Sequence, residues 1–191
     1  MPVTPVTTRN AFNLHNGGVM ISVDQLSRPS IRSTTLDSPL DHLVACHGRI
    51  EEKLAILERA AVALNDQPEE ARAALQTVFR HFDTAGVLHT RDEEESVFPR
   101  LLLQVSETER FYLRELEQQH RDAEEVYALL RDVPAQGSEL TEYVALVHRF
   151  CHLYRKHIAS ENERLIGTAR RVLSDEELAE VAVEMKGRRA R

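Results

Sequence analysis

The feature that most constrains the fold is the spacing of apolar side chains, which recur at alternating steps of four and three residues. This spacing places an apolar stripe along one side of an α-helix. It occurs in four segments, at about residues 39–64, 69–103, 107–133 and 138–173. Because the connections between them are only a few residues long, consecutive helices must be antiparallel neighbours. The sequence therefore predicts an all-α fold, an up-down-up-down four-helix bundle with an N-terminal extension and a short C-terminal helix.

Start signals mark three of the predicted helices. A serine followed three residues later by glutamate forms a capping box. A serine before a proline also suits a helix start, because proline lacks an N–H that the first turn would leave unpaired. The signals are Ser106 with Glu109, Ser174 with Glu177, and Ser38 with Pro39.

The second helix is interrupted at 83-DTAGVL-88. Gly86 costs about 1 kcal/mol inside a helix relative to alanine, and the interruption immediately precedes His89. Three interpretations are open: a kink, a means of setting the angle of His89, or an entrance for a ligand.

Length and local composition predict three parts. A chain of 191 residues holds one domain with tails. Residues 1–36 contain proline, glycine, serine and threonine without a sustained period, which predicts a mostly irregular extension. Residues 37–173 are expected to form the bundle, and residues 174–191 a terminal helix with a basic tail.

Charge and composition exclude several classes of protein. The formal net charge of -7 argues against nucleic acid or anionic lipid as a partner. No apolar run approaches the roughly 20 residues of a membrane span, and the start of the chain lacks a signal pattern. Cys46 and Cys151 make no disulfide framework, and are interpreted as buried thiols rather than a redox pair. A cytoplasmic location is predicted.

Two of the predicted helices present a histidine and a glutamate four residues apart, His89 with Glu93 and His157 with Glu161. Residues four apart share one helix face. A single pair of this kind is often only a surface ion pair. Its occurrence on two helices of one bundle indicates an internal polar site.

The other two helices each place a histidine in an otherwise apolar stripe, at His47 and His120. Burying such groups without partners would cost several kcal/mol, whereas coordination of a divalent metal satisfies neutral imidazole and carboxylate. The two carboxylates could each bridge a pair of ions, with histidines completing the outer positions. These donors, without thiolate, favour iron, with manganese second.

Several other acidic residues and histidines are not expected to bind metal. Glu94 and Glu95 are expected to be solvated neighbours of Glu93. The remaining histidines are not expected to bind metal, and these are His15, His42, His81, His148 and His152.

From about Ser38 to Leu173 the chain resembles the hemerythrin-like, or HHE cation-binding, family. The matching stretches are 46-CHGRIEEKLAIL-57, 89-HTRDEEESVFP-99, 119-QHRDAEEVYALL-130 and 157-HIASENERLI-166. The resemblance implies a centre of two non-haem iron ions. Its terminal imidazoles would be His47, His89, His120 and His157, and its bridging carboxylates Glu93 and Glu161. Ferritin-like proteins are the nearest rival, but they use Glu-x-x-His, with glutamate first and three residues away.

The chain departs from the oxygen-carrying hemerythrins on the third helix. Those proteins have a second histidine four residues after the first, where this chain has Glu124. If Glu124 binds, an anionic ligand should favour the ferric state. If it does not, one iron has an open position. Both arrangements argue against reversible oxygen carriage.

These residues are consistent with three functions. The first is a di-iron protein that binds or senses O2, NO or peroxide at the metal, or responds to iron. The second is a di-iron enzyme that breaks down peroxide or reduces nitric oxide, with Tyr127 or Tyr154 as a candidate proton donor. The third is a metal-free helical interaction module. The sequence identifies no catalytic residue and no protein partner.

Overall fold

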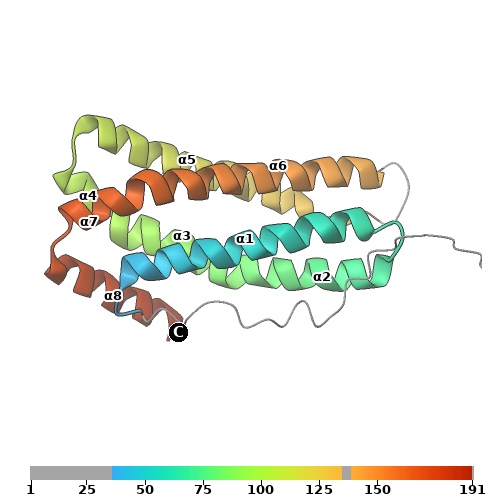
Figure 1. Ribbon diagram of the computed structural model, residues 1–191, viewed down its shortest axis with the longest axis horizontal. Helices are drawn as coiled ribbons and strands as arrows, with labels where there is room; N and C mark the ends of the chain where they lie inside the picture. The colour runs from blue at the N-terminus through green and yellow to red at the C-terminus, as the bar shows by residue number, and fades with distance from the viewer. Residues whose placement is uncertain (1–35, 135–138, 191) are drawn as a thin grey trace, which may run out of the picture. The chain divides into compact units, whose positions relative to one another are not determined.

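The computed structural model describes residues 36–134 and 139–190, and every element in these ranges is helical. Nearly all of the predicted extension, residues 1–35, lies outside the described residues. Figure 1 labels the α-helices, and η denotes a π-helical turn. They are α1 (Pro39–Ala63), α2 (Pro68–His81), η2 (Phe82–Gly86), α3 (Val87–Asp92), η3 (Glu93–Val97), α4 (Phe98–Gln104), α5 (Glu107–Leu130), α6 (Glu139–Ser160), η4 (Glu161–Leu165), α7 (Ile166–Val172) and α8 (Asp175–Arg189).

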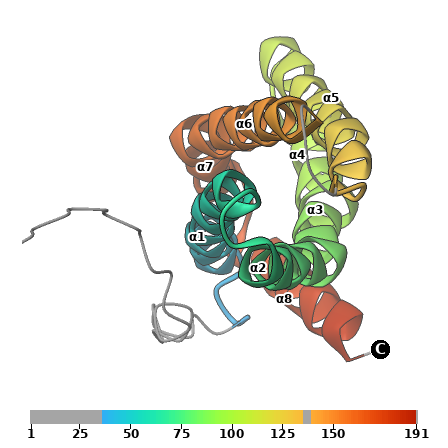
Figure 2. The ribbon, with the colours of Figure 1, turned by 90° about the vertical axis from the view of Figure 1, so that its right-hand side faces the viewer.

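These elements form the predicted four-helix bundle. The four rods are α1, the continuous run from α2 to α4, α5, and the continuous run from α6 to α7. Figure 2 looks along the rods and shows them around a common interior. The fifth helix, α8, packs against α1, α3 and η3. No helix in the described part of the chain combines the length and apolar character that crossing a bilayer requires.

Two of the three helix-start signals are confirmed in full. Ser106 with Glu109 and Ser174 with Glu177 form capping boxes. The third is only partly right: α1 begins at Pro39, but the Ser38 side chain makes no capping hydrogen bond. Ser38 has a ψ of 82°, outside the β-region of roughly 100–180° in which a capping serine normally lies.

The interruption in the second rod is a π-helical turn, η2. The helix continues through it, so it is neither a loop nor a helix end. A Cβ atom on Gly86 would lie 3.3 Å from the Phe82 ring, so glycine allows the turn to pack closely on that ring. Cys46 and Cys151 are buried free thiols, as predicted.

Candidate metal centre

A polar band crosses the interior between two apolar clusters. One cluster includes Ile50 and Ala123, and the other includes Leu43 and Leu116. Each rod passes from one cluster to the other and carries a histidine or glutamate at the crossing. The six crossing residues are His47, His89, Glu93, His120, His157 and Glu161, all with side chains no more than 8% exposed.

Both glutamates begin a π-helical turn. Glu93 is the first residue of η3 and Glu161 the first residue of η4. In each rod the preceding histidine lies four residues earlier, in ordinary α-helix. A π-turn widens the helix locally and occurs frequently at functional sites. The two rods therefore present the same local structure to the interior.

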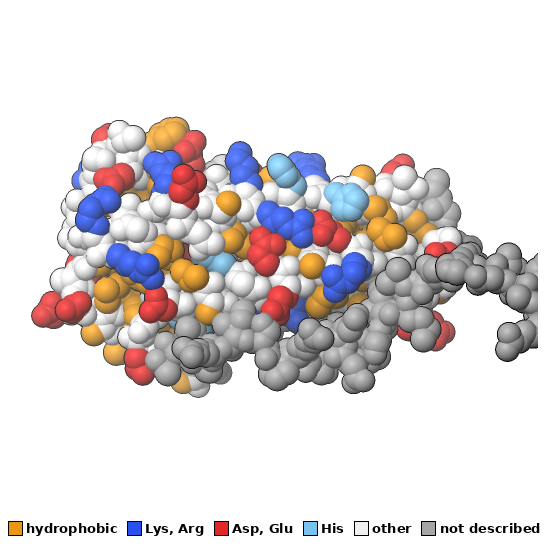
Figure 3. Space-filling view, viewed as in Figure 1, with side chains coloured by type: hydrophobic (Ala, Val, Ile, Leu, Met, Phe, Trp, Pro, Cys, Tyr) orange, Lys and Arg blue, Asp and Glu red, His pale blue; other side chains and the backbone are white. Residues whose placement is uncertain are grey.

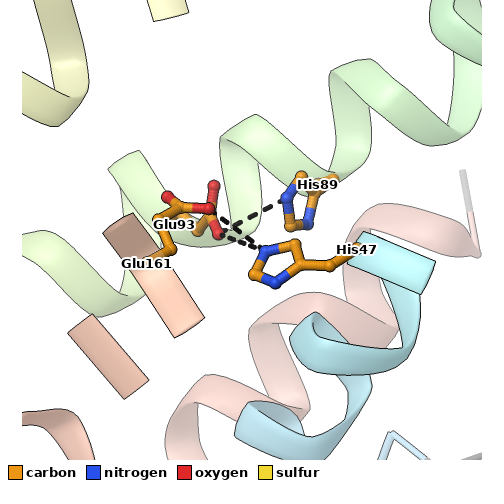
Figure 4. Close-up of side chains that lie close together, drawn as sticks. All are labelled: His47, His89, Glu93 and Glu161. Carbon is orange, nitrogen blue, oxygen red and sulfur yellow. Dashed lines mark ion pairs between the residues drawn. The ribbon is translucent and has the colours of Figure 1, made fainter. Parts of the chain in front are cut away.

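The first group of inward side chains is His47, His89, Glu93 and Glu161, which point toward one another in Figure 4. His47 Nε2 lies 3.1 Å from Glu161 Oε2 and 3.8 Å from Glu93 Oε1. His89 Nε2 lies 3.5 Å from the same Glu93 oxygen. One donor atom from each residue falls within 4.8 Å of the others, a spacing that suits a shared cation.

The second group contains the same two glutamates with His120 and His157. His120 Nε2 lies 3.5 Å from Glu93 Oε2, and His157 Nε2 lies 3.1 Å from Glu161 Oε1. Each carboxylate therefore directs one oxygen toward the first group and the other oxygen toward the second. This is how two carboxylates would bridge two ions.

The inward atoms lack hydrogen bonds in the described part of the chain. They are both carboxylate oxygens of Glu93 and Glu161 and the Nε2 atoms of His47, His89, His120 and His157. Leaving buried polar atoms unpaired costs roughly 1–3 kcal/mol each, and more when they are charged. A divalent cation in each group would satisfy all of them. The donor set of four imidazoles and two carboxylates therefore fits a pair of metal ions.

Three of the histidines are held from behind through Nδ1. His47 donates to Asn162 Oδ1 at 2.8 Å, His120 contacts Glu94 Oε1 at 2.8 Å, and His157 contacts Gln119 Oε1 at 3.1 Å. In each ring Nε2 is left facing inward. Such bonds orient a ligand imidazole and raise its basicity.

The prediction that Glu94 is only a solvated neighbour is wrong, because its carboxylate reaches across to His120. Asn162 and Gln119 were also missed. Each adjoins a predicted ligand in sequence but supports a histidine on another rod. No local spacing signals such a contact.

The pKa of each buried glutamate is lowered, which favours its ionised form. Burial raises the pKa of Glu93, but electrostatic attraction to His89, followed by His120 and His47, outweighs it and holds that pKa well below its usual range. For Glu161, burial and the neighbouring Glu93 are outweighed by His157 and His47, so its pKa is also lowered. The centre therefore presents negative charge to a cation.

The histidines differ in protonation. Burial opposes charge on His47 and His120, but their carboxylate partners raise the pKa of each to about 10. For His89, burial dominates and lowers the pKa to about 4. These shifts favour protonated His47 and His120 at neutral pH, and a bound metal ion would have to displace those protons.

A cavity of about 540 Å³ opens beside the second group, between η2, α3, α5 and α6. It reaches His120, and aromatic side chains from Phe82, Tyr127, Phe150 and Tyr154 line it. Asp83, Gly86 and Val87, from the interruption at 83–88, form part of this wall.

Glu124 also lines the cavity wall, and the structure does not bring it into either group. Its side chain is exposed. Among the histidines expected not to bind, His148 and His152 are exposed and His42 and His81 are half-buried. None of these four joins a group of potential ligands in the described residues, and His15 lies outside them.

Two comparisons with known proteins bear on this geometry. Residues 38–169 match the family model described as "Hemerythrin HHE cation binding domain". The chain is also 29% identical over 170 residues to a Haemophilus influenzae protein described as uncharacterized, an alignment covering 81% of this chain and 92% of that protein.

Proposed function

The chain belongs to the hemerythrin HHE cation-binding family, and we propose that it holds two non-haem iron ions. The proposed ligands are His47, His89, His120 and His157, with Glu93 and Glu161 as bridges. The observation that carries the proposal is the division of each carboxylate between the two groups, with every inward donor atom left without a hydrogen bond. Iron is proposed ahead of manganese because four of the six donors are imidazoles.

We propose further that the centre binds or senses a small ligand, O2, NO or peroxide. Bound iron would supply an open coordination position and a change of oxidation state. The chain itself would control what reaches the metal. The cavity leads from the surface to His120, and its aromatic walls keep bulk water from the buried carboxylates. Glu124, exposed on the same wall, is suited to selecting what enters.

The position of Tyr154 favours an enzyme, which turns over peroxide or nitric oxide, as a second candidate. Its ring lines the cavity and lies 6.4 Å from the His157 ring. Burial, followed by the nearby Glu93 and Glu161, raises the pKa of Tyr154, so Oη keeps its proton. In contrast, Tyr127 is occupied, with Oη 2.8 Å from Asp83 Oδ1 and 3.1 Å from Phe79 O. Tyr154, whose ring lies beside that of His157, is therefore the candidate donor to test, although its raised pKa makes it a weak acid.

We also propose a cytoplasmic protein that binds neither nucleic acid nor membranes. On the face seen in Figure 3, acidic and basic side chains are interspersed. Together with a net charge of -7, this gives no continuous basic surface on that face of the kind that follows a phosphate backbone.

The test uses untagged, purified protein. Elemental analysis should find about two irons per chain. Adding O2, NO or hydrogen peroxide to the ferrous protein should then change its absorption spectrum, and Glu93→Ala should abolish both results. Catalytic loss of peroxide that falls in Tyr154→Phe with iron retained would favour the enzyme. A folded protein that refuses ferrous ion would leave the metal-free interaction module.

A further inference from the structure

The last turn of α8 reaches the backbone segment that carries Glu93. Asp92 immediately precedes that ligand, and its side chain is fully buried. Arg188 Nε donates to Asp92 Oδ1 at 3.1 Å. Arg189 donates to both oxygens, Nη1 to Oδ1 at 3.2 Å and Nη2 to Oδ2 at 2.6 Å. Asp92 is thus held by two guanidinium groups from the far end of the sequence.

Arg188 also holds the turn that begins at Glu93. Arg188 Nη2 donates to the Ser96 hydroxyl, which is fully buried within η3. The guanidinium of Arg188 therefore binds both Asp92, just before Glu93, and Ser96, three residues after it. Because a π-turn departs from the regular hydrogen-bond ladder of an α-helix, contacts that hold Asp92 and Ser96 restrain the backbone before and after Glu93.

The rest of α8 is docked by different contacts. Val181, Ala182 and Met185 are buried against the bundle. Arg100 forms ion pairs with Glu180 and Glu184, at 3.1 and 2.9 Å, and also donates to Ser96 O in η3 at 2.9 Å. Lys186 of α8 instead pairs with Asp37, just before α1. The Lys186 pair is therefore a surface contact of α8 that does not involve η3.

We infer that Asp92, Arg188 and Arg189 are positioning residues for Glu93, so that docking of the α8 C-terminal turn sets the affinity of the centre for metal. A buried carboxylate that loses its cationic partners is strongly disfavoured, and here it would also lie next to the negative Glu93. Asp92 would then turn toward solvent and displace its neighbour. Because Glu93 belongs to both groups, both ions should be weakened. The inference rests on the proposed metal centre.

The coupling is reciprocal, because a contact that strengthens metal binding must itself be strengthened by metal. Metal should therefore protect α8 from opening. Helix α8 lies outside residues 38–169, the part matched to the family. The coupling between α8 and metal binding therefore rests on contacts of this chain and not on the family match.

The experiment compares two variants of the full chain by anaerobic ferrous titration against a chromophoric chelator. Arg188→Gln with Arg189→Gln should weaken binding of both ions by about 10- to 100-fold, the usual effect of removing a group that supports a ligand. The control, Lys186→Gln, removes a cation of the same helix that pairs with Asp37 and should retain wild-type affinity. Adding Asp92→Asn to the arginine variant should recover part of the loss, because the stranded charge is removed.

Hydrogen exchange supplies a second readout. Iron should slow exchange of the α8 amides in the wild-type chain, and should do so much less in the arginine variant. If circular dichroism shows that the double variant does not fold, Arg189→Gln alone replaces it. Wild-type affinities and iron-dependent protection in the arginine variant would overturn the inference. A wild-type chain that binds no metal would instead overturn the proposed centre.

Discussion

The two halves of the candidate centre share their carboxylates but differ in what surrounds their histidines. In the second group, His120 and His157 are both held through Nδ1. In the first group only His47 is held in this way, and neither nitrogen of His89 has a hydrogen-bond partner in the described residues. The second group borders the aromatic cavity of about 540 Å³, whereas a smaller pocket of about 380 Å³, lined in part by Glu51 and Arg155, reaches His47.

Because of this difference, we expect the two groups to bind metal with unequal affinity. A ligand imidazole that is already oriented binds metal more tightly than one that must be fixed on binding. We therefore expect the second group to bind its ion more tightly, and expect small ligands to reach the centre from that side. Each prediction below removes or enlarges this difference.

The largest effect should follow from removing a shared carboxylate. Glu93→Ala deletes a donor from both groups and leaves their histidines without a bridge. We expect metal content to fall from about two ions per chain to nearly none, measured by elemental analysis. Glu125→Ala is the control, because Glu125 is an exposed glutamate that belongs to neither group. Retention of two ions by the Glu93 variant would show that Glu93 is not a ligand.

Removing one terminal histidine should separate the halves. His157→Ala should eliminate the tighter ferrous binding step, and His89→Ala should eliminate the weaker one, each leaving about one ion per chain. Anaerobic ferrous titration of both variants provides the measurement. The proposed inequality would be wrong if His89→Ala removed the tighter step.

Removing a supporting hydrogen bond should make the halves more alike. Gln119→Leu frees His157 Nδ1 and should weaken the tighter step by about 10-fold, at the low end for groups that support a ligand. Gln118→Leu provides the control, because Gln118 is exposed and its amide contacts Asp122 instead. If both substitutions weakened the tighter step equally, the loss of affinity would come from a general disturbance of α5 and not from the lost contact with His157.

The pH dependence of the metal-free protein should reflect the raised pKa of His47 and His120, about 10 compared with an ordinary value of about 6.5. Their charged pairs are fully present below pH 6.5 and are lost as the pH rises through 10, so unfolding free energy should fall over this window. Metal affinity should rise over the same window, because binding releases these protons. Urea unfolding and metal titration between pH 7 and pH 10 test the two opposite slopes. A metal-free protein whose stability rises with pH would contradict this protonation pattern.

The smallest effect is expected at Glu124. This residue is exposed on the cavity wall and belongs to neither group, so Glu124→Gln should leave two ions bound with unchanged affinity. Only the rate at which peroxide or NO reaches the ferrous centre should change, measured by stopped-flow absorption. Loss of one ion in this variant would instead identify Glu124 as a ligand.

The sequence predicted the parts of this structure that depend on periodicity. Steps of four and three residues placed the rods, and the two His-x-x-x-Glu pairs placed four of the six inward residues on common faces. His47 and His120 were found because a histidine in an apolar stripe is conspicuous.

What the sequence did not reveal depends on contacts between rods or on local backbone geometry. Nothing in the acidic run after Asp92 indicates that Glu93 starts a π-turn, that Glu94 reaches His120, or that Asp92 binds the arginines of α8. Asp92 and Glu93 are both fully buried, but Asp92 contacts the arginines of α8 and Glu93 contacts the inward histidines. Such assignments require the packed structure.

The most direct test is an anaerobic titration of the wild-type chain with ferrous ion, monitored by isothermal titration calorimetry. Two ions per chain, bound in two steps of unequal affinity, are expected from a shared pair of carboxylates and differently supported histidines. Binding of a single ion, or of none, would contradict the bridged two-ion centre.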